Sequence, residues 1–226
     1  MKNKIAKITF LFFLQSTTLA LSLETGIFAV IPSVTSVDDR PMLWINRESE
    51  HKDIQLYYFR GEHYDYIGVI ENHDTSRVFM GMNTAGFALV YTEAFDQTGD
   101  SLADNGQFTK SALGVCGKID DLNELLQKNH TATNFGCFDV YGNCAVFETG
   151  HDITKYDVND RNDAAEGFLV RSNFSFSGRK DIPGTSWRYH RARELLNTAV
   201  NSHKLDYKYI IQHVARDLKN PDMDPY

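Results

Sequence analysis

The sequence predicts an α+β fold, with antiparallel strands through its first two thirds and helices towards its end. Short runs rich in Val, Ile, Phe and Tyr predict strands at residues 27–31, 42–45, 55–59, 66–70, 78–82 and 87–91. Turn-forming residues separate these runs, at positions 38–39, 61, 72–74 and 83–86. Connections this short join antiparallel neighbours, so we expect hairpins rather than parallel crossovers.

Helical patterns enter later in the chain. Residues 120–128 are predicted as a helix, because Asp120 or Asp121 can cap it and its leucines share one face. The other expected elements are a hairpin of residues 134–140 and 144–148, a strand at 167–171, and helices at 187–200 and 207–218. Strands followed by helices, without strict alternation, indicate a layered α+β domain.

The first 22 residues have the features of a secretory signal. Three lysines and no acid precede an apolar run at residues 8–14. Ala20 and Ser22 lie at the small-x-small spacing that signal peptidases recognise, so we expect the mature chain to begin at Leu23; cleavage nearer Ser16 is the alternative. The run is short of the roughly 20 residues that span a bilayer. We therefore expect a secreted or periplasmic protein, with no membrane anchor after removal of the signal.

Residues 23–226 are expected to form one domain. The full chain is 42% hydrophobic and 12% aromatic, which is enough for a substantial core, and no linker divides it. Its net charge is −7, and loss of the signal removes three lysines, which leaves the domain more acidic. An acidic surface repels phosphate backbones and anionic membranes, so we expect neither nucleic acid nor lipid as a partner. Nothing in the sequence indicates an oligomeric state.

Cysteine and histidine spacing predicts neither a disulfide scaffold nor a metal site. Cys116, Cys137 and Cys144 do not have the spacing of metal ligands. Cys137 and Cys144 flank a Tyr-Gly-Asn turn and could form one bridge, but we expect buried free thiols. The eight histidines stand singly, and no His-Glu-x-x-His, Gly-x-Ser-x-Gly or phosphate-binding Gly-rich motif is present. We expect no cofactor.

Six segments, taken in order, carry a resemblance to a known family. They are "GIFAVIPSVTSVDDRPMLWINRES", "YYFRGEHYDYIGVI", "VFMGMNTAGFALVYTEAF", "NFGCFDVYGNCAVFETG", "FLVRSNFSFSG" and "SWRYHRARELL". In this order they resemble the N-terminal nucleophile (Ntn) hydrolase superfamily, in the branch of penicillin acyl-coenzyme-A acyltransferases and choloylglycine or linear-amide hydrolases. The match runs from about Gly26 to the C-terminus.

The resemblance implies an αββα sandwich of two antiparallel sheets, and a small-molecule N-acyl amide as substrate or ligand. Members of the family usually continue beyond the point where this sequence stops, and the additional strands extend both sheets. We therefore expect an incomplete sandwich, in which sheet edges and apolar faces are left uncovered.

The resemblance also implies a mechanism, in which an N-terminal Cys attacks the amide and its own α-amino group carries the proton. Counting back from the turn of Asp38, Asp39, Arg40 and Pro41, the nucleophile position falls on Gly26. Glycine has no side chain that could attack an amide. At the turn itself, Asp39 stands where the family usually has Gly, and Asp tolerates the left-handed backbone required there.

Further departures lie at the end of the following strand. The family's Arg-Asn-x-Asp corresponds here to Ile45, Asn46, Arg47 and Glu48. Asn46 is kept, Ile45 stands at the Arg position and Glu48 at the Asp position. We expect Arg47 to point to the other face of the strand.

The resemblance places two oxyanion donors and a late Arg further along. The first donor, an Asn in the family, falls near Thr92 or Glu93; a Thr hydroxyl can donate one hydrogen bond, whereas a Glu carboxylate would repel an oxyanion. Asn173 matches the second donor and Arg188 the late Arg, so we expect both to approach Gly26. Taken alone, they would be interpreted as a turn residue and a solvated helix charge.

Three hypotheses about function follow. The departures favour a pseudoenzyme that keeps the pocket and binds a small amide without cleaving it. The first alternative is a working amidase or acyltransferase that uses Thr25 after cleavage between Glu24 and Thr25, since Thr is a nucleophile elsewhere in the superfamily. The second is a shortened, non-catalytic copy with at most a binding role.

Overall fold

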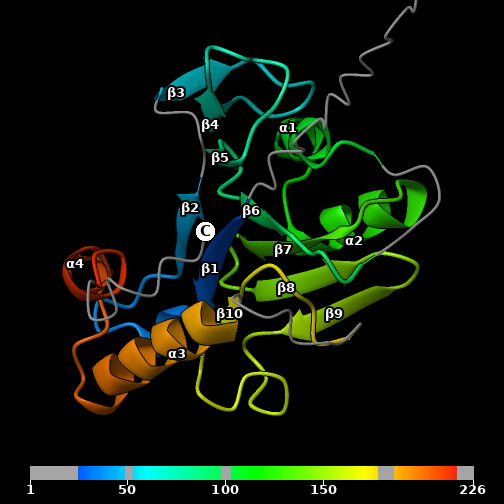
Figure 1. Ribbon diagram of the computed structural model, residues 1–226. Coiled ribbons are helices and arrows are strands. Elements are labelled where there is room, and N and C mark those ends of the chain that lie inside the picture. The colour runs from blue at the N-terminus through cyan, green and yellow to red at the C-terminus, as the bar shows by residue number, and fades with distance from the viewer. Residues whose placement is uncertain (1–24, 49–52, 98–102, 178–185, 218–226) are drawn as a thin grey trace, which may run out of the picture.

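The computed structural model describes residues 25–48, 53–97, 103–177 and 186–217. Within them four layers are stacked: helices, a seven-stranded sheet, a three-stranded sheet and a second set of helices (Figure 1). Both sheets are antiparallel. The αββα sandwich implied by the resemblance is therefore confirmed. The predicted signal at residues 1–22 lies outside the described residues.

The large sheet is a meander in which each strand pairs with the next one along the chain. Its strands are β3 (Ile54–Phe59), β4 (Tyr66–Glu71), β5 (Met80–Asn83), β6 (Ala88–Glu93), β7 (Thr133–Phe138), β8 (Cys144–Thr149) and β9 (Ile153–Asp157). Asn72 and His73 adopt positive φ angles of 51° and 58° after β4, and Gly142 has a φ of 84° between β7 and β8. These lie in turns that the sequence predicted.

The small sheet has β1 at its centre. Its strands are β1 (Thr25–Ile31), β2 (Met42–Glu48) and β10 (Leu169–Arg171), in the order β10-β1-β2. The connection from β1 to β2 passes through the 3-10 turn η1 (Ser33–Thr35) and through Asp39, whose φ is 55°. Asp39 thus takes the left-handed conformation that was expected of it.

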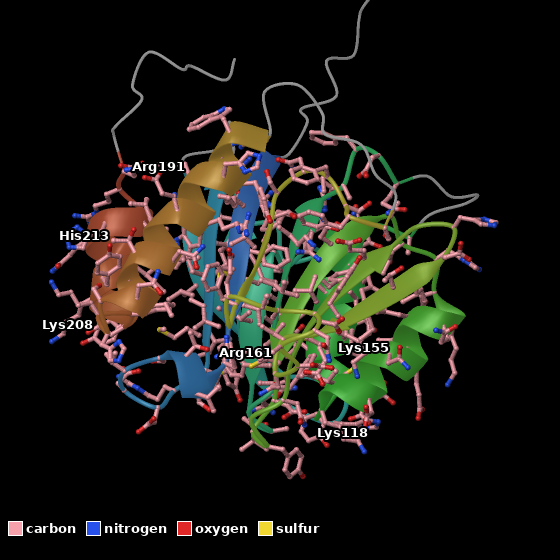
Figure 2. The ribbon with its side chains drawn as sticks, turned by 90° about the horizontal axis from the view of Figure 1, so that it is seen from below. Lys118, Lys155, Arg161, Arg191, Lys208 and His213 are labelled. Carbon is pink, nitrogen blue, oxygen red and sulfur yellow. The ribbon has the colours of Figure 1, made fainter. Side chains whose placement is uncertain are left out.

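Helices cover the outer face of each sheet. The large sheet carries α1 (Asn105–Val115) and α2 (Ile119–Lys128), and the small sheet carries α3 (Ser186–Asn201), the short α4 (Tyr207–Tyr209) and the π-helical turn η2 (Ile210–Val214). Figure 2 shows Arg191, Lys208 and His213 on the flank of α3 and α4, with Lys118 on the opposite flank beside α2. Among the described residues, none of these helices combines the length and the apolar character that a membrane span requires.

The alternation of β1 sets the composition of two cores. Phe28 and Val30 face the space between the sheets, where they join Val90 and Val146 of the large sheet. The odd-numbered residues of β1 from position 27 onward point to the other face and pack against α3. Successive residues of a strand point to opposite faces, so Gly26 belongs to the series that faces the large sheet.

Some elements differ from the sequence-based expectation. The helix α1 was not predicted, because Gly106, Thr109 and Gly114 have weak helix propensity. It is capped by Asp104, whose carboxylate accepts the N–H of Gln107 at 2.9 Å. The strand β9 was missed because it is partly exposed and has no apolar run. The helix expected over residues 207–218 widens into η2 after only three residues.

The small sheet leaves part of the large sheet uncovered. β1 and β2 lie over β6 and β7, whereas β3, β4 and β5 extend beyond the edge strand β2 (Figure 1). This overhang of β3, β4 and β5 forms a step beside β2. A groove of about 650 Å³ lies in the step, and it is lined by apolar side chains of β2 to β5 and by Tyr207, Ile210 and Ile211. On its floor, Leu56 and Ile67 are 76% and 53% exposed. An uncovered edge and an uncovered apolar face were both expected from the sequence.

All three cysteines are buried free thiols, which confirms the prediction made for Cys137 and Cys144. Cys137 packs with the helices on the large sheet and Cys144 packs between the sheets, so the two point to opposite faces of their hairpin and form no bridge. Burial raises the pKa of Cys116 and of Cys144 to about 12, and it raises the pKa of Cys137 well above its ordinary value.

The folded protein should resist alkylation by iodoacetamide at mildly alkaline pH, because a buried thiol with a raised pKa supplies little thiolate. Intact mass spectrometry should show no adduct on the native protein and an adduct on each cysteine after denaturation. The exposed substitution Val34→Cys is the positive control and should add one adduct in the native state. Rapid labelling of a native cysteine would contradict the structure.

Candidate functional site

Gly26, the expected nucleophile position, lies near the start of β1 on the face that meets the large sheet. It is buried, and it stands opposite Arg47 in the β1–β2 register. A Cβ atom added at Gly26 would lie 3.2 Å from the carbonyl oxygen of Asn46 and 3.4 Å from the methyl carbon of Thr92. Groups from both sheets therefore surround this position.

The side-chain amide of Asn173 holds the backbone at Gly26. Its Oδ1 accepts the N–H of Gly26 at 3.1 Å and Nη2 of Arg188 at 3.2 Å. Its Nδ2 donates to the carbonyl oxygen of Glu93 at 3.0 Å. Asn173 is fully buried, and Arg188, in the first turn of α3, is nearly so. The structure thus brings Asn173 and Arg188 together at Gly26, while their catalytic roles stay predictions.

Of the two candidates for the first oxyanion donor, only Thr92 faces Gly26. Its hydroxyl donates to the carbonyl oxygen of Ser172 at 3.1 Å. Glu93 turns towards α1, where its Oε2 accepts Nδ2 of Asn105 at 2.9 Å. The Glu93 carboxylate therefore points away from the site, and the Thr92 hydroxyl is already used in a structural hydrogen bond.

The position of Arg47 corrects an expectation about β2. Because cross-strand partners share a face of a sheet, Arg47 lies on the same face as Gly26 and not on the other one. Its Nε donates to Oε1 of Glu71 at 2.6 Å, and its guanidinium carbon lies 3.5 Å from the centre of the Phe79 ring. Ile45, two residues earlier on that face, packs between the sheets. An ion-paired arginine therefore stands opposite the nucleophile position. We refer to Gly26, Arg47, Thr92, Asn173 and Arg188 as the Gly26 site.

The structure does not bring the side chain of Asn46 to Gly26. Its Nδ2 donates to the carbonyl oxygen of Ala215 at 3.2 Å, just after η2 on the helical side of the small sheet. Only the backbone carbonyl of Asn46 approaches Gly26. Thr25 and Glu48 lie opposite each other at the end of the β1–β2 ladder, and the roles expected of their side chains stay predictions.

A buried ion pair lies in the same inter-sheet space. Arg171 of β10 donates through Nε to Oε1 of Glu148 of β8 at 2.5 Å, and both side chains are excluded from solvent. The guanidinium carbon of Arg171 lies 4.8 Å from the Tyr156 ring centre and 4.4 Å from that of Phe176. The sequence analysis missed this pair. The sequence did contain one indication of it: Glu148 is an acid at an inward-facing position of the apolar strand β8, and a buried charge requires a partner.

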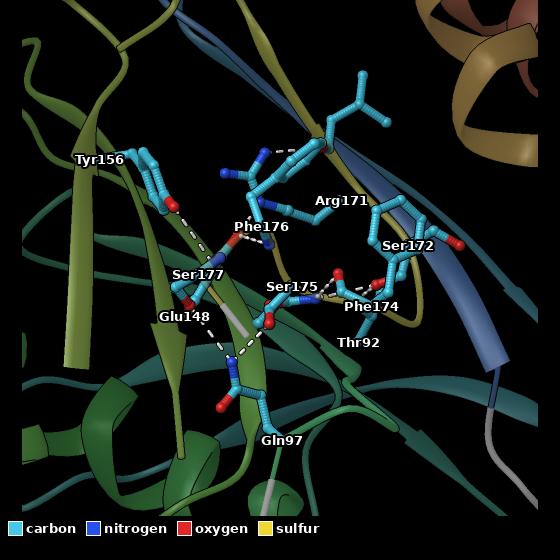
Figure 3. A network of polar contacts seen from close by, with 12 residues as sticks. Thr92, Gln97, Glu148, Tyr156, Arg171, Ser172, Phe174, Ser175, Phe176 and Ser177 are labelled. Atoms are coloured by element: carbon cyan, nitrogen blue, oxygen red, sulfur yellow. Dashed lines mark hydrogen bonds and ion pairs between the residues drawn. The ribbon is translucent and has the colours of Figure 1, made fainter. Parts of the chain in front are cut away.

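Glu148 also holds the loop that carries Asn173 (Figure 3). Its Oε1 accepts the backbone N–H of Phe176 at 2.9 Å, and its Oε2 accepts that of Ser177 at 2.7 Å. One carboxylate thereby joins β8 to β10 and to the loop that follows β10. The network fixes the backbone on the C-terminal side of Asn173.

Two further side chains hold the same loop. Asn134 of β7 donates through Nδ2 to the carbonyl oxygens of Ser172 and Phe174, each at 2.9 Å. Asp96 accepts the backbone N–H of Ser175 at 2.9 Å and its hydroxyl at 2.8 Å. The two carbonyls that flank position 173 are therefore both anchored to the large sheet.

The Glu148 carboxylate is ionised at neutral pH. Burial acts to raise the pKa of Glu148, but the charge of Arg171 and the donors of Phe176 and Ser177 outweigh it, so the pKa lies below its ordinary value. Burial and the neighbouring Glu148 carboxylate raise the pKa of Tyr156. No cluster of His, Cys, Asp and Glu among the described residues could hold a metal ion.

Comparison with known proteins identifies the fold. No protein-family model and no curated protein matches the sequence. The structure is similar to that of a cysteine-to-alanine mutant of the conjugated bile acid hydrolase from Clostridium perfringens. The TM-score is 0.57, with 12% identity over 83% of this chain and 77% of that one.

Two other solved structures also match. They are an arginine-to-leucine variant of the same hydrolase (TM-score 0.48, 13% identity, 86% of this chain and 70% of that one) and penicillin V acylase from Agrobacterium tumefaciens (TM-score 0.43, 16% identity, 86% and 64%). The likeness to the first hydrolase shows a shared fold, which agrees with the αββα sandwich of two antiparallel sheets expected from the sequence.

Replacing Glu148 by glutamine should lower the free energy of unfolding by about 3–5 kcal/mol, because it leaves the Arg171 charge buried without its partner. Denaturant unfolding measures the change. The matched control is Glu166→Gln, whose partner Arg193 is 44% exposed, and which should cost less than about 1 kcal/mol. Equal losses in the two variants would show that the Glu148 pair is not buried as described.

The same carboxylate should make stability sensitive to acid. Its folded-state pKa lies below the reference value of 4.5, so its contribution is complete above that value and is lost as pH falls through the folded pKa. Unfolding free energies measured at a series of acidic pH values should therefore decline below pH 4.5. In Glu148→Gln the decline should be flatter. An unchanged slope in the variant would assign the acid sensitivity to other carboxylates.

Proposed function

We propose that this protein binds a small N-acyl amide at the Gly26 site and does not cleave it. The observation that carries the proposal is Gly26 itself, because the position at which the resemblance expects a thiol has no side chain. A shared fold does not by itself imply a shared activity. The residues at the site therefore decide between a hydrolase and a binding protein.

Neighbouring hydroxyls do not replace the missing thiol. The Thr92 hydroxyl donates to the Ser172 carbonyl, and the Ser172 hydroxyl contacts the carbonyl oxygen of Gly26 at 3.4 Å. A hydroxyl needs an adjacent base to become a nucleophile. In the part of the chain that the structure describes, neither hydroxyl contacts a carboxylate or an imidazole.

The same site suits recognition of a polar amide. Arg188 adds a positive charge that can pair with the carboxylate of an N-acyl amino acid, and Arg pairs with carboxylates in a planar, bidentate geometry. Asn173 holds the guanidinium of Arg188 at the site, because its Oδ1 accepts Nη2 of Arg188 at 3.2 Å. The similar structures are named for conjugated bile acids and penicillin V, which are small amides, and this supports the same class of ligand here.

A working amidase that uses Thr25 is the alternative. It requires cleavage between Glu24 and Thr25, so that the free α-amino group of Thr25 can take the proton of its own hydroxyl. Thr25 is the first residue of β1 and adjoins Gly26, so the cut would place a hydroxyl nucleophile next to the site. A shortened copy without a ligand is the remaining hypothesis.

We also propose export, on the basis of the N-terminal sequence. Protein recovered from the periplasm or the medium of an expressing bacterium should have the mass of a chain that begins at Leu23. Retention of Met1 would contradict export with cleavage. A mature start at Thr25 would instead support the amidase alternative.

Incubation with penicillin V and with a conjugated bile acid should release no product, while binding should raise the melting temperature. Arg188→Ala should abolish the thermal shift. Arg193→Ala, on a more exposed part of the same helix, should preserve it. Product released by the unmodified protein would overturn the proposal, and the absence of any shift with N-acyl amides would favour the shortened copy.

Gly26→Cys, expressed so that residue 26 is the first of the chain, should restore little hydrolysis. Thr92 stands where an Asn donor is expected, and one missing oxyanion donor costs about a hundredfold in rate. Adding Thr92→Asn should therefore raise the rate of Gly26→Cys well above that of the single variant. Val34→Cys, exposed and distant, measures the background of a free thiol. Full activity from Gly26→Cys alone would show that Thr92 suffices as a donor.

A further inference from the structure

The groove beside β2 is lined by residues other than those of the Gly26 site, and its floor is an apolar sheet face exposed to solvent. Leu56, Ile67 and Met82, from three neighbouring strands, are 76%, 53% and 49% exposed. Adjacent apolar side chains of this kind mark interaction surfaces in soluble proteins. We propose that this groove binds an extended segment of another polypeptide, which pairs with the edge of β2 and covers β3 to β5.

The groove continues the core between the two sheets. Leu43, Ile45 and Met80 line the groove and also pack against the inter-sheet cluster. A layer that extends this core must lie about 10 Å from the large sheet, which is the plane of the small sheet. An occupant in that plane is a direct neighbour of β2. The geometry therefore requires an extended strand that can pair with β2, and not only an apolar group that fills the groove.

The backbone of β2 is oriented to accept such a strand. Gly26 directs its N–H towards the β10 side, to Asn173, and not towards β2. Because backbone groups of an antiparallel ladder alternate in direction, the residues of β2 opposite the even-numbered residues of β1 turn their N–H and C=O groups outward. Leu43 and Ile45 are in this set. Strand addition to an exposed edge uses groups of this kind, with alternate side chains filling the groove.

A second copy of the chain does not fit this place. If two copies paired β2 with β2 about a twofold axis, both large sheets would lie on the same side of the joined small sheets. The step formed by β3, β4 and β5 is three strands wide, roughly 14 Å at the usual strand spacing. The large sheet of the partner would need the same space. A second copy joined through β2 is therefore excluded, and the occupant that we propose is an extended segment of a different polypeptide with apolar residues at alternate positions.

The test uses the full chain and a short fluorescent peptide that alternates valine with threonine. The peptide should bind, measured by fluorescence anisotropy, and it should slow hydrogen exchange at the amides of Leu43 and Ile45. A version methylated on its backbone nitrogens keeps the same side chains but cannot add to a sheet, so it should not bind. Equal binding of both peptides would show that the groove only adsorbs apolar side chains without strand pairing, and it would overturn the proposal.

Matched variants locate the binding. Leu56→Lys and Ile67→Lys place a charge on the groove floor and should each weaken peptide binding about tenfold or more. Val34→Lys changes a side chain with the same 76% exposure as Leu56, away from the groove, and should have no effect. Similar losses in all three variants would contradict the proposal. A concentration-dependent dimer that Leu56→Lys abolishes would show that a second copy is the occupant, and would also contradict it.

Discussion

Glu148 lies between the two sheets, where a carboxylate without partners would cost several kcal/mol. It is paired with Arg171 and with two backbone N–H groups of the loop that follows β10. Satisfying this one charge therefore fixes the end of β10 and the loop together. Asn173 lies on that loop, and through its amide the constraint reaches Gly26 and Arg188. The geometry of the candidate site thus depends on one buried charge, which acts on the same loop as Asn134 and Asp96.

The hydrogen bonds around Gly26 hold the site together rather than leaving its donors directed at a ligand. Thr92 and Asn173 direct their hydrogen-bond donors at backbone carbonyls, which ties the large sheet to the loop. A donor used in this way contributes to stability rather than to an oxyanion. The pairing of Arg47 with Glu71 likewise neutralises a charge beside the site. The proposed binding role therefore needs no group that the fold does not already hold in place.

The order of six short segments was enough to predict the fold and the approach of Asn173 and Arg188 to Gly26. Local patterns also predicted most strands, because their turns carry residues that adopt positive φ. Arg47 was assigned to the wrong face of β2, because the direction of its side chain depends on the cross-strand register, and the local sequence pattern does not determine that register. Glu148 was missed because its partner Arg171 is 23 residues away along the chain, and such a pairing is a tertiary event.

The topology also has a consequence for the order in which the chain assembles. The large sheet consists of neighbours in sequence, so most of its pairings close short loops, and the longest connection, between β6 and β7, spans only residues 94–132. The contact between Gly26 and Asn173 instead joins residues 147 positions apart. Loop closure over such a distance is slow and carries a larger entropic cost. We therefore expect the meander of β3 to β9 to form first, as a template on which β1 docks late. The N-terminal strand would then stay accessible to processing enzymes until the segment that carries Asn173 has been synthesised.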